Sequence, residues 1–437
     1  MLAALIVSLA LVQGPAQESF FNKLFPKPTG LNGYEDFAKA ADMARRLYIG
    51  TYQGWLPPER RPEPTPESEK SKEVKEIEAA LEEDRDPKEE ALQKRLEALN
   101  LLQVRTEESQ MGVPIIQLVK VGLQKPVSKP SVDEDLFSFA SGHMRQIGGL
   151  LSDTAYVQFS QGKSSLGFDS LATGLRFADA TSPFGTMELL TSSGITSRML
   201  GGFDQNLARL SVADLQKLPA LCRSLLASNR LAETYAYEEA IQVREMDSIA
   251  KDFLTPGAED IEDPTFKALA KEIKAMTPVQ KKGFAAELRR RVHERFVVVQ
   301  QELRKPEAEW IPPNEDERME DPKTPNLSAV MDFIAAMVMP PRHAIATTYV
   351  RSRTQIRLLD LHSRVLAFRW IHNRLPANLA EAGVETASTY DSLSRTAFVY
   401  EVQTDRTYRL YSKGNATTGE VELRYIRPPS SPDNDKP

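Results

Sequence analysis

The sequence predicts a mainly α-helical chain that ends in a small α+β unit, where one long helix packs on a three-stranded antiparallel sheet. Three observations support this fold class. Apolar residues recur at helical steps through most of the chain. Three segments begin with the capping-box pattern that marks a helix start. Residues 397–426 instead form three short runs rich in aromatic and β-branched residues, which turn residues separate.

The longest amphipathic segment covers residues 342–374. Its apolar residues repeat at steps of three, four or seven, and they form a stripe of Ile345, Tyr349, Ile356, Leu359, Leu366 and Trp370. A second set widens this stripe, namely Leu358, Leu361, Val365 and Phe368. Pro376 stops the helix. We expect the stripe to pack on one face of the sheet, with Trp370 at the end of that core, because so small a sheet is marginally stable alone.

The expected strands are residues 397–402, 407–412 and 421–426. Residues 404–406 join the first two, and a loop that contains Gly414 and Gly419 joins the second and third. Side chains such as Phe398 and Tyr400 alternate along these runs, as they do when one face of a sheet is buried.

Segments of this unit resemble the globular C-terminal part of type II secretion pseudopilins. The segments are His372-Asn373-Arg374-Leu375-Pro376, Phe398-Val399-Tyr400 and Tyr408-Arg409-Leu410-Tyr411-Ser412. The resemblance covers residues 342–426 and is shared with a set of uncharacterised exported bacterial proteins. Members of that set tend to start with an Asn-Gly-Tyr-Glu/Asp-Asp motif, which residues 32–36 match. The resemblance implies a fold but no reaction. A pseudopilin begins at this helix with an apolar transmembrane half, whereas here the helix is internal and carries arginines, so we do not expect pilus assembly through it.

The N-terminal residues predict export. Residues 2–12 form an apolar run that is shorter than the roughly 20 residues of a membrane-spanning helix. Gly14 and Ala16 provide the small residues of a cleavage site, so residues 1–16 read as a signal peptide. No basic residue precedes the run, and an N-terminal core helix is the alternative interpretation. We expect a periplasmic or secreted protein with no stable transmembrane segment after cleavage.

Composition divides the rest of the chain. Residues 17–56 should hold an N-terminal helix that Asn32 caps, and residues 57–90 form a linker rich in Pro, Glu and Lys, with too few apolar side chains for a core. Residues 91–306 should form an all-helical domain. Its capping boxes start at Ser131, Ser211 and Thr277, and a helical hairpin turns at Gly162. We expect continuous helices over residues 211–253 and 277–305.

An acidic connector follows at residues 307–325. The C-terminal helix-and-sheet unit covers residues 326–428 and opens with a short helix over residues 326–339, and residues 429–437 should form a disordered tail.

The totals exclude several classes of protein. With 437 residues, of which 41% are hydrophobic, the chain can bury a sizeable core. A net charge of −6 argues against a nucleic-acid-binding protein. Cys222 is the only cysteine, which rules out an intramolecular disulfide, a cysteine-rich zinc site and a CxxC redox pair.

No motif in the sequence predicts catalysis. The five histidines form no HExxH pattern, and His362 and His372 would lie about 15 Å apart along one helix. Ser160 and Lys163 match SxxK, but Gly162 interrupts the turn between them. We therefore predict no catalytic, cofactor-binding or metal-ligating residues and no cofactor. We expect the arginines of residues 289–295 and 342–374 to face acidic connectors of this chain, or solvent.

The leading interpretation is an exported, non-catalytic helical protein of unknown role that binds another protein or an envelope component. One alternative is an envelope hydrolase whose site is assembled from residues scattered in sequence. Another is an accessory component of a secretion or pilus-like system. A pocket with convergent polar groups would favour the hydrolase, and an exposed apolar patch would favour the other two.

Overall fold

A computed structural model describes residues 25, 27–51, 101–128, 134–254, 273–311, 327–404 and 406–423. The expected signal peptide, the linker at 57–90, the capping box at Ser131 and the C-terminal tail lie outside these residues. The chain forms two compact units, Met1–Phe177 and Ala178–Pro437. This boundary lies within the expected all-helical domain, and the helix-and-sheet unit shares its compact unit with the helices from residue 186 onward.

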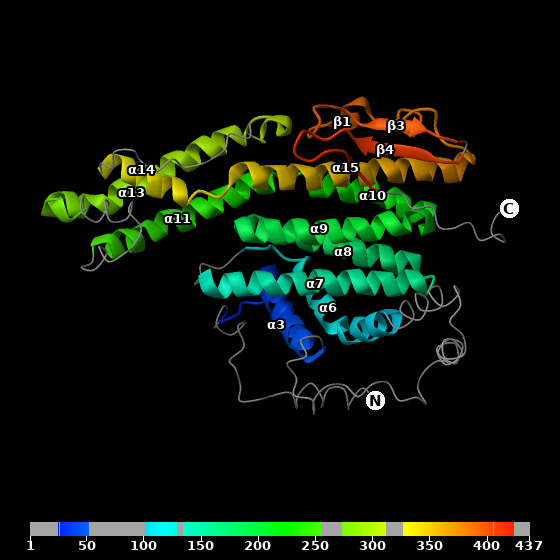
Figure 1. Cartoon of the computed structure of the whole chain (residues 1–437). Helices are drawn as coiled ribbons and strands as arrows, with labels where there is room; N and C mark the ends of the chain where they lie inside the picture. The colour runs from blue at the N-terminus through cyan, green and yellow to red at the C-terminus, as the bar shows by residue number, and fades with distance from the viewer. Residues whose placement is uncertain are drawn as a thin grey trace, which may run out of the picture. The chain divides into compact units, whose positions relative to one another are not determined.

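The described part of the chain is mainly helical, with two small antiparallel sheets (Figure 1). The first unit contains a helix at residues 101–111, α3 (Gly33–Thr51), α6 (Val113–Gly122), α7 (Glu134–Ser160) and most of α8 (Ser164–Thr181). The second contains α9 (Thr186–Asn206), α10 (Val212–Leu226), α11 (Arg230–Leu254), α13 (Pro278–Glu302), α14 (Leu327–Met337) and α15 (Arg342–His372). Its short 3₁₀ turns are η2 (Ser182–Phe184), η3 (Leu207–Arg209), η5 (Glu307–Glu309) and η6 (Thr386–Thr389).

Three of these helices start at the N-cap side chains that the sequence predicts. The Asn32 Oδ1 accepts a hydrogen bond from the Tyr34 amide at 3.0 Å, just before α3. Ser211 caps α10 by accepting from the backbone amide of Asp214. Thr277 and Gln280 form a reciprocal capping box at the start of α13. Gly162, with a φ of +72°, makes the turn between α7 and α8.

The Asn-Gly-Tyr-Glu-Asp motif at residues 32–36 fastens the start of α3 to its surroundings. Asn32 donates to the Ser128 carbonyl at 2.6 Å, and Asp36 pairs with Lys125 at 2.6 Å. The Glu35 carboxylate accepts from the amides of Thr29 and Gly30. A Cβ at Gly33 would lie 2.2 Å from the Gly122 carbonyl oxygen, so only glycine permits the close approach of α3 and α6. The motif therefore has a structural role in the first unit.

The expected single helix over residues 211–253 is wrong. The structure has two helices there, and residues 227–229 belong to neither of them. Asn229 then caps α11 by accepting from the Ala232 amide at 3.2 Å. The new helix can pair with α13, while α10 pairs with α15.

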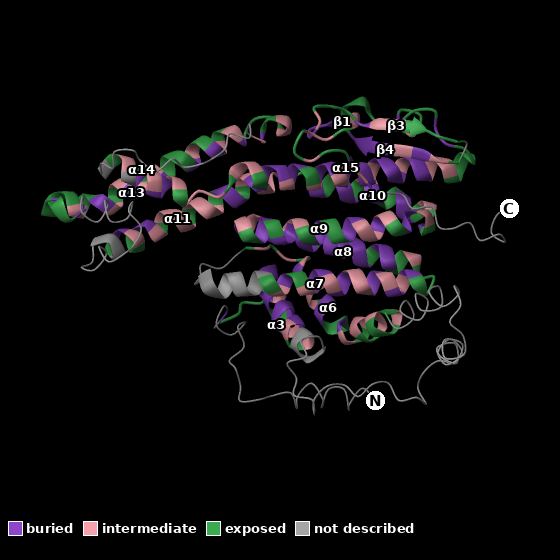
Figure 2. Cartoon of the chain, viewed as in Figure 1, coloured by how far each residue is buried: buried purple, intermediate pink, exposed green. Residues whose placement is uncertain are grey.

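Helix α15 is buried on two sides, between the sheet and helices α9 and α10 (Figures 1 and 2). On one side Thr354 bonds to Asp391, and the His362 Nδ1 lies 2.9 Å from the Tyr408 hydroxyl oxygen. On another side Arg353 donates to the carbonyl oxygens of Leu226 and Ser228 at the end of α10.

Ile356 and Leu359, two residues of the stripe that was expected to face the sheet, point the other way. An α-helix turns by about 100° per residue, so Ile356 points roughly 160° away from Thr354, which faces the sheet. Leu359 lies about 60° from Ile356 on the same side, and both are buried toward α9 and α10. Leu366 lies about 120° from Thr354 but only about 40° from His362, which meets Tyr408 of the sheet, so Leu366 lies at the margin between the two sides. The sheet is instead covered by the side that carries the set Leu358, Leu361 and Val365. Trp370 is 59% exposed, so it does not close a core as expected.

The main sheet has the strand order β3-β4-β5 and is antiparallel throughout. Its strands are β3 (Val399–Val402), β4 (Tyr408–Ser412) and β5 (Val421–Glu422), within the three expected runs. The structure also has a second sheet that the sequence did not predict, in which β1 (Tyr390–Asp391) pairs with β2 (Thr396–Ala397).

The fully buried Asp391 joins α15 to both sheets. Its Oδ1 accepts from the Thr354 hydroxyl and the Leu393 amide, both at 3.1 Å. Its Oδ2 accepts from the Ser394 amide at 3.0 Å and from the Ser412 hydroxyl at 2.5 Å. Four donors therefore satisfy this carboxylate, as burial of a charged group requires.

Candidate functional site

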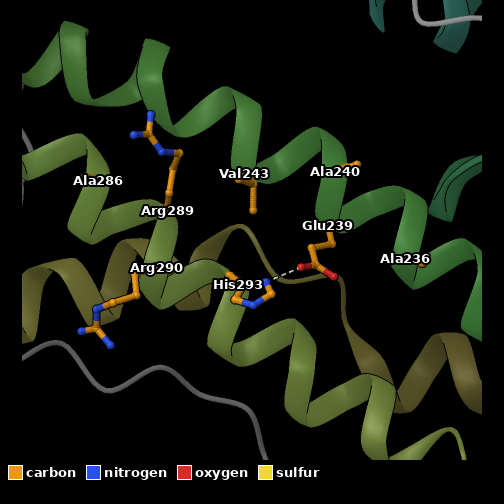
Figure 3. A pocket seen from close by; sticks show the side chains of 8 residues that line it. All are labelled: Ala236, Glu239, Ala240, Val243, Ala286, Arg289, Arg290 and His293. Atoms are coloured by element: carbon orange, nitrogen blue, oxygen red, sulfur yellow. Dashed lines mark hydrogen bonds and ion pairs between the residues drawn. The ribbon is translucent and has the colours of Figure 1, made fainter.

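An open pocket of about 410 Å³ lies between α11 and α13 (Figure 3). Helix α11 contributes Ala236, Glu239, Ala240 and Val243, and helix α13 contributes Ala286, Arg289, Arg290 and His293. The three alanines leave the space, because their side chains fill little of the gap between the helices. The polar side chains on its edge make this pocket the candidate site.

The sequence of α13 explains why these two helices pair. Buried apolar side chains recur at steps of three or four along it, namely Phe284, Leu288, Val292, Phe296, Val299 and Leu303. Tyr235 on α11 lies with its ring centroid 6.3 Å from that of Phe296. The buried stripe fixes the rotation of α13, and Arg289, Arg290 and His293 then fall beside the pocket.

Glu239 and His293 point toward one another across the pocket (Figure 3). The Glu239 Oε1 lies 2.5 Å from the His293 Nδ1, and the Glu239 Oε2 accepts a hydrogen bond from the Gln300 side-chain Nε2 at 2.5 Å. The His293 side chain is 57% exposed. A carboxylate on Nδ1 orients an imidazole and leaves Nε2 to face solvent or a ligand. The residues that line the pocket include no hydroxyl or thiol that the Glu239–His293 pair could activate as a nucleophile.

The arginines beside the pocket are paired with carboxylates on α11 and on α13 itself. Arg289 pairs with Asp247 on α11, and Arg290 pairs with Glu287 and Glu294 on α13. Hydrogen bonds from Arg290 and its neighbouring arginine lower the pKa of Glu287 to about 2. These arginines were expected to face acidic connectors or solvent. Their side chains are partly exposed to solvent, and their carboxylate partners lie on helices rather than in the connectors.

The second group of arginines does meet an acidic connector. Arg353 and Arg357 on α15 pair with Glu307 at 2.7 and 2.6 Å, and Glu307 is the first residue of the expected connector. The two guanidinium groups lower the pKa of Glu307 against the opposing effect of burial, which is the larger single influence. For Arg353 and Arg357 this agrees with the prediction, and the contact joins Glu307 to α15.

The histidines do not converge. His143 lies on α7, His293 on α13, and His343, His362 and His372 on α15. Burial lowers the pKa of His362 to about 4. Within the described ranges, no group of three or more His, Cys, Asp or Glu side chains could hold a metal ion.

The SxxK pair is separated by its local structure. The Ser160 hydroxyl donates to the Tyr156 carbonyl at 2.9 Å, which is an ordinary bond within α7. The Lys163 ammonium donates to the Gln161 side chain at 2.9 Å, beyond the turn at Gly162. The two groups therefore do not form a nucleophile and base.

The exposed end of α15 carries two large apolar side chains. Trp370 and Ile371 are each 59% exposed. Asn373 ends the helix in the left-handed conformation, with a φ of +53°, and Arg374 lies over the Phe368 ring at 5.0 Å. No helix in the described ranges combines the length and apolarity that crossing a membrane requires.

Comparisons with protein-family models, curated proteins and solved structures find no match to this chain. The resemblance to pseudopilins and to exported bacterial proteins therefore remains a prediction.

Proposed function

We propose that this chain is an exported, non-catalytic protein that binds another protein or an envelope component. The observation that carries the proposal is the exposure of Trp370 and Ile371 on adjacent positions at the end of α15. Exposed tryptophan is the side chain most typical of binding hot spots, because it buries a large area with few rotatable bonds.

Polar side chains that could serve catalysis have structural partners instead. Asp391 and Ser412 bond to one another inside the sheet, and Ser160 bonds within its own helix. Glu307 pairs with two arginines of α15. Because these side chains are bonded to other groups of the protein, they support a binding role over a hydrolytic one, since a catalytic group must reach a substrate.

Crosslinking tests the proposal. A photoreactive amino acid at Ile371 of the full chain should form a discrete protein adduct in the native envelope, and Trp370→Ser should reduce its yield. The same probe at Val298, an exposed apolar position on α13, is the matched control and should form no such adduct. Equal labelling from both positions, or a yield that ignores Trp370, would contradict the proposal. Intact-mass analysis of the same material should find a chain that starts at Gln17.

An envelope hydrolase is a second candidate because of the Glu239–His293 pair in its pocket. Ester hydrolysis by the purified chain that disappears in His293→Ala would favour this reading. An accessory role in a secretion or pilus-like system is a third candidate, and the long helix on a three-stranded sheet supports it. Impaired secretion in a strain that lacks the chain would favour that role.

A further inference from the structure

The edge of the main sheet at β3 offers backbone groups for pairing. The order β3-β4-β5 places β3 at one edge, and the strand contains neither proline nor lysine, which often protect edges. Glu401 and Val402 are exposed, and the Val402 side chain is among the exposed large apolar groups at 47%.

The hydrogen-bond pattern shows which groups point outward. The Gln403 amide donates to the Thr407 carbonyl, so the backbone groups of Gln403 point toward β4. Residues 399 and 401 lie four and two positions earlier in the same register, so their backbone groups also point toward β4. In an antiparallel ladder, bonded and non-bonded pairs alternate, so the amides and carbonyls of Tyr400 and Val402 point away from β4. Phe398 has the same outward phase, and its amide donates to the Thr389 carbonyl at 2.8 Å. Within the described residues, Tyr400 and Val402 have no such backbone partner.

The charges on the outer face of the sheet indicate which side chains an added strand should carry. Pairing of Glu401 with Arg409 places both on the face opposite Tyr408, which contacts α15. Arg409 also pairs with Glu420 and Glu422 at 2.6 and 3.1 Å. Arg409 is therefore shared by several glutamates, and a basic side chain beside Glu401 on an added strand would form a favourable cross-strand charge pair.

We propose that β3 binds an extended segment of a partner protein as an added strand, with a basic side chain beside Glu401. Backbone bonds to Tyr400 and Val402 would hold the segment. A second copy of this chain is disfavoured in the register that pairs Tyr400 with Val402 of the copy, because Glu401 would then face its equivalent. This inference rests on the proposed binding function and names one surface and one kind of partner for it.

Binding of synthetic peptides to the purified full chain tests the inference. The probes are fluorescein-labelled seven-residue peptides, one alternating valine with lysine and the other valine with glutamate, measured by anisotropy at low salt. The lysine peptide should bind more tightly than the glutamate peptide. Val402→Pro removes one outward amide without removing a ladder bond, and it should weaken binding by roughly three- to tenfold. Val402→Thr keeps the amide and is the matched control.

The peptide backbone offers an independent check if Val402→Pro fails to fold. A lysine peptide that is N-methylated along one edge should lose affinity for the unaltered chain. Absence of lysine-peptide binding, equal affinity for both peptides, or unchanged affinity in the proline variant would overturn the inference. So would a dimer that Val402→Pro dissociates, because the edge would then belong to a second copy. The crosslink at Ile371 does not depend on these results, so the two proposals can fail separately.

Discussion

Replacing Asp391 by asparagine should destabilise the second unit by about 2–4 kcal/mol. The carboxylate accepts one backbone amide on each oxygen, from Leu393 on Oδ1 and from Ser394 on Oδ2. Hydroxyl donors can rotate, but these amides cannot, and an asparagine side chain has only one oxygen. One backbone amide must therefore face an NH₂ group, and an unpaired buried donor costs about 1–3 kcal/mol. Loss of the charge on the remaining bonds accounts for the rest.

Urea unfolding of the full chain measures this loss, and hydrogen exchange of the peptide that covers Leu393 and Ser394 locates it. Asp391→Ala leaves all four donors unpaired and should cost more than Asp391→Asn. Glu385→Gln changes the same two functional groups at an exposed position near β1 and should cost under about 0.5 kcal/mol. If Asp391→Asn costs no more than Glu385→Gln, the carboxylate does not hold both amides and the reasoning fails.

Three further substitutions test the packing by the same urea assay. Gly33→Ala should destabilise the first unit because the new Cβ meets the Gly122 carbonyl. Gly142→Ala, in open space on α7, is the control and should be neutral or stabilising. Equal effects of the two substitutions would contradict the close approach of α3 and α6. Burial lowers the pKa of His362 from 6.5 to about 4, so the unfolded chain binds the proton more readily. Stability should fall by on the order of 3 kcal/mol as pH decreases from about 6.5 to 4, and a His362→Leu variant that keeps this slope would refute the assignment. Arg353→Leu should cost about 3–5 kcal/mol by leaving buried partners, against under about 0.5 for Arg351→Leu at an exposed position; similar losses would exclude a special role for Arg353.

Local patterns predicted most of the elements. The errors concern where one helix ends and which side of a helix packs against which neighbour. Capping at Ser211 and Thr277 located two helix starts because those contacts span only three residues. The break after α10 was missed because Ala227-Ser228-Asn229 contains neither glycine nor proline. Helix α15 has two apolar sides, and periodicity finds both without telling which one meets the sheet.

Sequence patterns could not predict the candidate site. Glu239 and His293 are 54 positions apart, and they meet only because α11 and α13 pack side by side. The two-residue strands β1 and β2 are similarly invisible, since the bonds of Asp391 to other elements support them. By contrast, attraction between an acidic connector and the α15 arginines was predictable from charge alone.

Burial of α15 on both sides determines which fragments of this chain could fold by themselves. A fragment of residues 342–423 would keep the sheet and the side of α15 that covers it. It would also bring Ile356 and Leu359 into water, because α9 and α10 would be missing. Such a fragment should self-associate rather than remain a monomer. The C-terminal helix and sheet therefore form one half of a shared core and are not an autonomously folding module.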